Sequence, residues 1–80
     1  MEPAVAFGKI LRQLRQEAGL TQEALGFEAD LRRTYVSILE LGQQQPSLTT
    51  ILKLAKALNL TGSTLVGMIE SELAAPKRKR

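Results

Sequence analysis

The 80-residue chain contains no cysteine and no histidine. These absences exclude disulfides, thiolate nucleophiles, imidazole general bases and the usual zinc sites. Aromatic residues are also scarce, at 4% of the chain, although 44% of its residues are hydrophobic. The core is therefore expected to be aliphatic. The abundance of Leu, Ala, Lys, Glu and Gln favours an all-α fold and argues against a β-sandwich or barrel.

Long apolar runs and targeting signals are missing as well. The N-terminus, Met1-Glu2-Pro3, has no basic region, and no apolar stretch approaches the ~20 residues that a membrane-spanning helix needs. We therefore expect a soluble, cytoplasmic protein with no membrane partner. No residue pattern indicates a cofactor, a metal site or a small-molecule ligand.

The positive charge is concentrated at one end of the chain. The net charge is +3, but residues 1–76 hold seven basic and eight acidic residues, a net charge of −1. The high isoelectric point therefore comes from the tail Lys77–Arg80, which is too short and too charged to pack and is expected to be disordered. We expect residues 1–76 to form a single domain, and nucleic-acid binding by it must be judged from where its own arginines lie.

Glycines, prolines and helix-capping residues divide the chain into five short predicted helices. The first is expected from about Ala4 to Ala18, since its apolar residues recur every three or four positions and Gly19 follows. The second is expected over 22–29 after an N-cap at Thr21, and the third over 32–41 before Gly42. Pro46-Ser47 opens a fourth helix, with a stripe at Leu48, Ile51, Leu52, Ala55 and Leu58. Thr61 or Ser63 opens a fifth, which carries Leu65, Met68, Ile69 and Leu73 and ends at Pro76.

Only Asp30-Leu31 separates the second helix from the third, which predicts a tight helix-turn-helix over about 22–41. Two helices that cross so closely need a small residue at their contact, and Gly26 lies in mid-helix, where it costs about 1 kcal/mol in propensity. Asp30 is among the few non-glycine residues that tolerate positive φ in a turn.

Three segments resemble the lambda-repressor-like regulators of the Cro and xenobiotic-response-element type. Gly19-Leu20-Thr21-Gln22-Glu23-Ala24-Leu25 is similar to the opening of their motif, and 31–42 resembles their second motif helix. Pro46-Ser47-Leu48, followed by 52–58, is similar to their fourth helix. The resemblance covers roughly residues 7–70. In size and in its Arg-Thr-Tyr run, the chain looks most like the small controller proteins of restriction–modification systems.

The resemblance implies a compact five-helix DNA-binding domain that acts as a homodimer on an operator in double-stranded DNA. It also implies that Arg15 and Glu40 form the ion pair that ties the first helix to the third in this family. Two features depart from the family. Arg32 stands where Ser or Thr usually caps the third helix, and the apolar Ile38 and Leu41 occupy positions that are usually polar or basic.

A helical projection of the third helix directs Leu31, Tyr35, Val36 and Leu39 inward. The opposite arc holds Arg33, Thr34, Ser37 and Leu41, with Ile38 on its flank. Direct readout in the major groove requires such an exposed arc. Arg33 suits a bidentate contact with guanine, Thr34 and Ser37 suit polar contacts, and Ile38 suits a thymine methyl. A plain solvated face is the alternative.

Backbone contacts with DNA are expected around this helix. Gln22 begins the second helix, where free N–H groups favour a phosphate, and its side chain could also brace the recognition helix. The tyrosine hydroxyl and the amide-rich loop after the third helix suit the sugar-phosphate backbone. The expected DNA-binding residues are Gln22, Arg32, Arg33, Thr34, Tyr35, Ser37, Ile38, Gln43 and Gln44.

Dimerisation is expected through the fifth helix, with Leu65, Val66 and Ile69 shared between core and interface. Catalysis is not expected, because the carboxylates are scattered and no triad or metal cluster can be built. Two other functions remain open. The same fold could serve as a protein-interaction module, antitoxin-like or bridging, with Ile38 and Leu41 facing the partner. The tail Lys77–Arg80 could instead drive sequence-independent DNA packaging.

Overall fold

A computed structural model describes residues 1–75, and the tail Lys77–Arg80 lies outside the described residues. Its regular elements are all helices: α1 (Pro3–Glu17), α2 (Gln22–Ala29), α3 (Arg33–Glu40), α4 (Leu48–Ala57) and α5 (Gly62–Ala74). The predicted all-α class and the number of helices are confirmed. Within residues 1–75, no helix has the length and apolar character needed to span a membrane.

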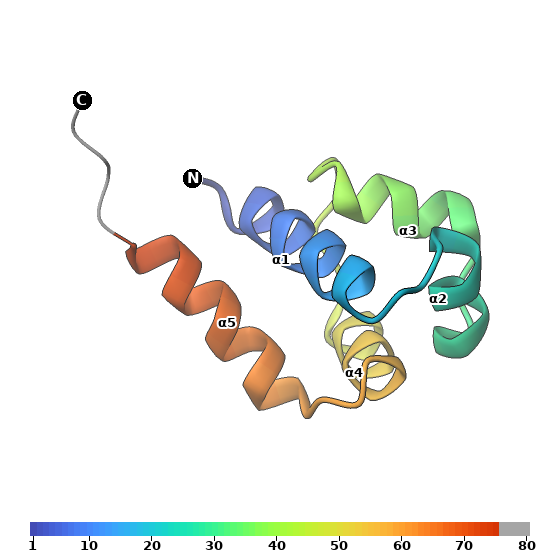
Figure 1. Ribbon diagram of the computed structural model, residues 1–80. Coiled ribbons are helices and arrows are strands. Elements are labelled where there is room, and N and C mark those ends of the chain that lie inside the picture. Colours follow the sequence, from blue (N-terminus) through green and yellow to red (C-terminus); the bar gives the residue numbers. More distant parts are fainter. Residues whose placement is uncertain (76–80) are drawn as a thin grey trace.

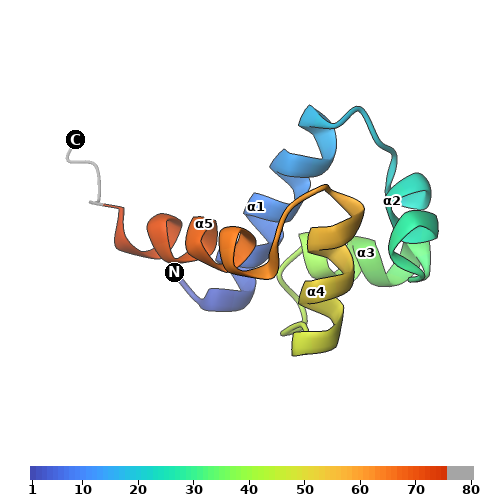
Figure 2. The same cartoon turned by 90° about the horizontal axis from the view of Figure 1, so that it is seen from below.

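The helices close into a ring of contacts around one core. α1 packs against α3 and α5, α2 against α3 and α4, and α4 against α5 (Figures 1 and 2). Buried aliphatic side chains fill the centre, and Phe7 is the one aromatic residue among them: Ala6, Phe7, Leu11, Leu25, Ala29, Val36, Leu39, Leu54, Ala55, Leu65 and Ile69. The core is aliphatic, as the composition predicts.

Side-chain caps begin three of the helices where the sequence places them. Thr21, Ser47 and Thr61 each accept a hydrogen bond from the backbone N–H three residues later, at 3.0–3.1 Å. Of the two expected starts for α5, Thr61 is therefore the cap. Arg32 precedes α3 without a side-chain cap, as its chemistry predicts. α3 starts at Arg33 rather than Arg32, which takes the N-cap position, and ends at Glu40 rather than Leu41, which takes the C-cap position.

The expected apolar stripe of α4 is partly wrong. Leu48 and Leu52 are 69% and 51% exposed, whereas Leu54 and Ala55 are buried. The reason is that α4 packs between α2 and α5, so its buried face is shifted toward Leu54. The first helix is displaced by one residue from the prediction, since Pro3 takes its first position.

Candidate nucleic-acid interface

The corner between α2 and α3 has the geometry of a helix-turn-helix. Asp30 adopts the left-handed conformation (φ 58°), and the Leu31 N–H donates to the Gly26 carbonyl at 2.7 Å. A Cβ added to Gly26 would lie 2.6 Å from the Leu31 carbonyl oxygen, so the two helices cross at a distance that only glycine permits. The predictions for Gly26 and Asp30 are confirmed.

α1 approaches α3 as closely as α2 does, at a glycine that the sequence reasoning missed. A Cβ on Gly8 would overlap the Leu39 carbonyl oxygen and lie 2.7 Å from that of Glu40. Gly8 sits in the middle of α1, where glycine is unfavourable by about 1 kcal/mol relative to alanine. This mid-helix glycine, two turns before Arg15, was the sequence signal for the contact.

The outer surface of α3 presents one continuous arc. Arg33 and Thr34 are exposed in its first turn, and Leu41, the C-cap residue, is 64% exposed at the other end. Ser37 lies between them and is half-buried. Ile38 and Tyr35 are also half-buried, and the Tyr35 ring packs on the core. The exposed Leu41 and the half-buried Ile38 agree with the helical projection, which places Leu41 on the arc and Ile38 on its flank.

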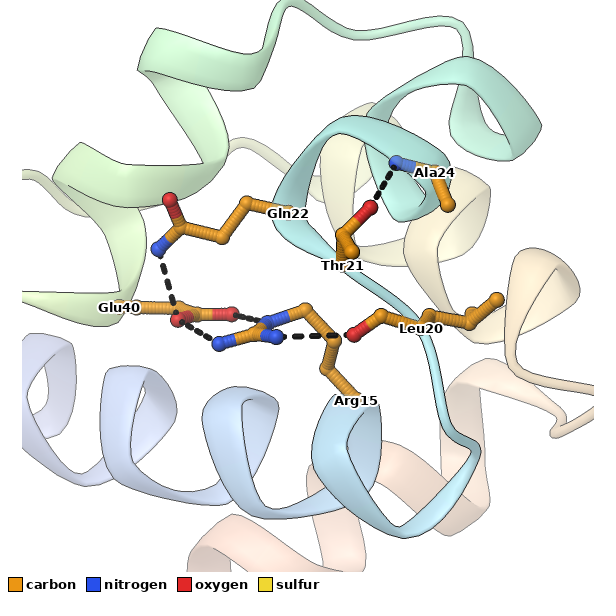
Figure 3. A network of polar contacts seen from close by, with 6 residues as sticks. All are labelled: Arg15, Leu20, Thr21, Gln22, Ala24 and Glu40. Carbon is orange, nitrogen blue, oxygen red and sulfur yellow. Dashed lines mark hydrogen bonds and ion pairs between the residues drawn. The ribbon is translucent and has the colours of Figure 1, made fainter.

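A polar network fixes this arc to the rest of the domain (Figure 3). Arg15 of α1 donates from Nε to Glu40 Oε2 at 2.6 Å and from Nη2 to Oε1 at 3.0 Å. Gln22 Nε2, from the first residue of α2, donates to the same Oε1 at 3.0 Å. The third Arg15 donor, Nη1, reaches the Leu20 carbonyl at 2.9 Å, so the α1–α2 turn is held as well. The structure thus contains the ion pair that the resemblance implies.

The ion pair is shielded from solvent. Its side chains are 12% (Arg15) and 3% (Glu40) exposed. Hydrogen bonding to Glu40 raises the pKa of Arg15 above its ordinary value, burial acts against this rise, and the ionic attraction of Glu40 adds to it. The charge of Arg15 is consequently fixed throughout the accessible pH range, and its role is structural.

Gln22 braces the recognition helix through Glu40, which is one of the two roles expected for it. The other expected contacts surround α3 at the surface. Arg32 is exposed at the N-cap position, and Gln43, Gln44 and Gln45 are exposed in the loop after α3, which the buried Pro46 closes. Contact of these residues with DNA stays a prediction.

The expected interface residues of α5 differ in exposure. Leu65 is fully buried and Ile69 is 8% exposed, because both pack into the core against the other helices. Val66 is 39% exposed. We therefore correct the expectation that Leu65 is shared with an interface and assign it to the core alone.

Comparison with known proteins places the chain in a family. Residues 11–65 match the model described as helix-turn-helix. The control protein C.BamHI of Bacillus amyloliquefaciens is 43% identical over 61 residues, which are 75% of this chain and 75% of that protein. The control protein C.MunI of Mycoplasma sp is 39% identical over 69 residues, 85% of this chain and 93% of that protein.

A solved structure agrees with this relationship. The restriction-modification controller protein C.AhdI from Aeromonas hydrophila superposes with a TM-score of 0.75 at 48% identity, over 78% of this chain and 94% of that chain. The chain therefore belongs to the helix-turn-helix family of DNA-binding transcriptional regulators.

Proposed function

We propose that the protein is a sequence-specific transcriptional regulator that binds an operator as a homodimer, with α3 of each subunit in the major groove. The observation that carries the proposal is the exposed arc of α3, which begins with Arg33 and Thr34, while Val36 and Leu39 on the opposite face of the helix are buried in the core. The similarity to control proteins supports a controller role of the restriction–modification type.

Arg33 is the strongest candidate for base readout. It is exposed in the first turn of α3, and the N-terminal residues of recognition helices contact base edges. Its guanidinium can donate to O6 and N7 of guanine, while Thr34 and Ser37 supply hydroxyls for neighbouring polar groups. We assign the backbone contacts to Gln22, Arg32, Gln43 and Gln44 and to the Tyr35 hydroxyl, which together set the register of α3 on the duplex.

Two copies are needed because one recognition helix reads too few base pairs for an operator. Paired helices about 34 Å apart would read two half-sites one turn apart. The face that we propose for dimerisation joins α5 to α4. Val66 and Leu52 are 39% and 51% exposed there, and Leu52 Cδ2 lies 2.6 Å from the position of a Cβ on Gly62, which brings the two helices into contact.

Val66→Asp tests the dimer. Because Val66 is exposed, the variant is expected to fold, whereas Ile69→Asp would place a carboxylate in the core. Sedimentation of the wild type should give a dimer at micromolar concentrations, and Val66→Asp should give a monomer. Phe27→Asp, at an 84% exposed site on α2, serves as the control and should remain dimeric. A wild-type protein that sediments as a monomer would contradict the homodimer.

Selection from a library of random duplexes tests the sequence specificity. The wild type should enrich a palindrome. Arg33→Ala should then lose about 1–3 kcal/mol on that palindrome and relax the preference at one base position in each half-site. If Arg33→Ala lost the same affinity on all sequences, Arg33 would contact only phosphates. If no duplex is enriched, the regulator proposal fails and a protein-interaction module becomes the better reading of the fold.

A further inference from the structure

The arc of α3 ends in an apolar side chain that the proposed contacts do not use. Leu41 is 64% exposed, and a helical projection places it between Thr34 and Ser37, at the centre of the arc rather than on its edge. Single exposed leucines are common on protein surfaces. What distinguishes this one is that it shares the face of the helix that is proposed to enter the groove.

The chain turns away immediately after Leu41. Gly42 adopts a left-handed conformation (φ 72°) and its N–H donates to the Leu39 carbonyl, while the Gln43 N–H donates to the Ile38 carbonyl. This pair of hydrogen bonds is a Schellman motif, which ends the helix and redirects the backbone. The α3–α4 loop therefore leaves Leu41 uncovered.

An apolar side chain has one chemical target on the edges of the base pairs in the major groove, the C5 methyl group of thymine. We propose that Leu41 is a specificity-determining residue that packs on a thymine methyl in each half-site. The proposal rests on the proposed function and adds to it the chemistry of one operator position.

The geometry also fixes where that thymine lies. Leu41 is eight residues beyond Arg33, a rise of about 12 Å along the helix axis. Base pairs lie about 3.4 Å apart along the duplex axis, and a helix that follows the groove is inclined to that axis, so this rise covers at most three or four base pairs. The half-site should therefore contain the guanine read by Arg33 and, at most three or four base pairs further along α3, a thymine read by Leu41.

Uracil substitution tests the contact, because uracil lacks the methyl of thymine and keeps its hydrogen-bonding groups. The palindrome enriched by the wild type is synthesised with each thymine of the half-site replaced in turn, in both half-sites at once. Burial of one methyl-sized group changes affinity about fourfold. A duplex with uracil at the contacted position in both half-sites should therefore bind about fifteenfold more weakly. Replacing the same thymine by 5-bromouracil, whose bromine has nearly the size of the methyl, should restore the affinity.

The protein variants assign the effect to Leu41. In Leu41→Ala the same uracil substitution should change affinity less than about twofold, because the side chain that covers the methyl is gone. Leu48→Ala, at a leucine of similar exposure (69%) on α4, should keep the wild-type ratio of thymine to uracil affinity. Since Leu41 is mostly exposed, its variant should melt within a few degrees of the wild type, which thermal unfolding checks.

Three results would overturn the proposal. The first is that no thymine of the half-site can be replaced by uracil with a loss of affinity. The second is that Leu41→Ala keeps the wild-type ratio of thymine to uracil affinity. The third is that Leu48→Ala loses this ratio as well. An unchanged affinity ratio in Leu41→Ala would mean that Thr34 or Ile38, rather than Leu41, packs on the thymine methyl. If the selection enriches no duplex, the proposed function fails and this inference fails with it, whereas the other outcomes contradict this inference alone.

Discussion

Gln22 and Glu40 are joined by a hydrogen bond that links the first residue of α2 to the last residue of α3, with Gln22 Nε2 3.0 Å from Glu40 Oε1 (Figure 3). A carboxylate only accepts hydrogen bonds, so the carboxamide nitrogen must face Glu40 and the carboxamide oxygen must face away. Arg15 donates to the same oxygen of Glu40. The start of the helix-turn-helix, its recognition helix and α1 are therefore held by one carboxylate.

Removing that carboxylate should destabilise the domain more than removing Gln22. We expect Glu40→Gln to lower the free energy of unfolding by about 3 kcal/mol, because it leaves a mostly buried arginine without its counter-charge. Gln22→Ala should cost about 1 kcal/mol, the usual net worth of one hydrogen bond. Urea denaturation of each variant measures both values.

A matched control separates this network from an ordinary surface pair. Glu72→Gln breaks the pair between Lys9 and Glu72 (2.7 Å), whose lysine side chain is 57% exposed, and should cost less than about 1 kcal/mol. The double variant Gln22→Ala/Glu40→Gln should fall short of the sum of the single costs, because Glu40→Gln replaces the charged acceptor of the Gln22 hydrogen bond by a neutral amide oxygen and so leaves a weaker bond for Gln22→Ala to remove. Additive costs would show that Gln22 and Glu40 act independently.

Two glycines in the middle of helices should respond to alanine with opposite signs. Gly67 of α5 has nothing within 4 Å of an added Cβ, so Gly67→Ala should raise the free energy of unfolding by about 0.8 kcal/mol through helix propensity. At Gly8 the added Cβ meets the backbone of α3, and we expect Gly8→Ala to cost about 1–3 kcal/mol. Thermal unfolding of both variants under one condition provides the comparison, and stabilisation by Gly8→Ala would contradict the close approach.

The helix-turn-helix could be predicted from the sequence because its determinants are local. Thr21 caps α2, Gly26 allows the crossing and Asp30 makes the turn, and each acts within a few residues of its own position. The same holds for the caps of α4 and α5 at Ser47 and Thr61. Such features follow from the intrinsic conformational preferences of single residues and from contacts with residues close in sequence.

The remaining details depend on contacts between distant segments. The apolar stripe of α5 includes Leu65, Val66 and Ile69, but only the packing against α1 and α4 determines that Leu65 is fully buried and Val66 is exposed. The bond between Gln22 and Glu40 joins residues 18 apart and requires the crossing of α2 over α3. Helical periodicity places a side chain on a face, but it does not say how far a neighbouring helix covers that face.

Arg32 offers a case in which stability and DNA affinity should change in opposite directions. It occupies the N-cap position of α3 with extended backbone angles (φ −75°, ψ 146°), the conformation of a capping residue, yet its side chain makes no capping hydrogen bond. In Arg32→Ser the hydroxyl can accept from the Tyr35 N–H, in the way that Thr21 accepts from Ala24, and it would share this N–H with the residue 32 carbonyl, to which Tyr35 already donates at 3.0 Å. We therefore expect the free energy of unfolding to rise by about 0.5 kcal/mol, the low end of the range for a capping residue.

DNA binding should weaken in the same variant, because the proposed phosphate contact loses its charge. Each phosphate neutralised by a subunit contributes about 0.9 to the slope of log affinity against log salt, so the slope should fall by about that amount per subunit. Arg32→Lys keeps the charge without a capping group and should match the wild type in both stability and slope. A stabilised Arg32→Ser protein with an unchanged salt slope would mean that Arg32 points into solvent and that the missing cap serves no contact with DNA.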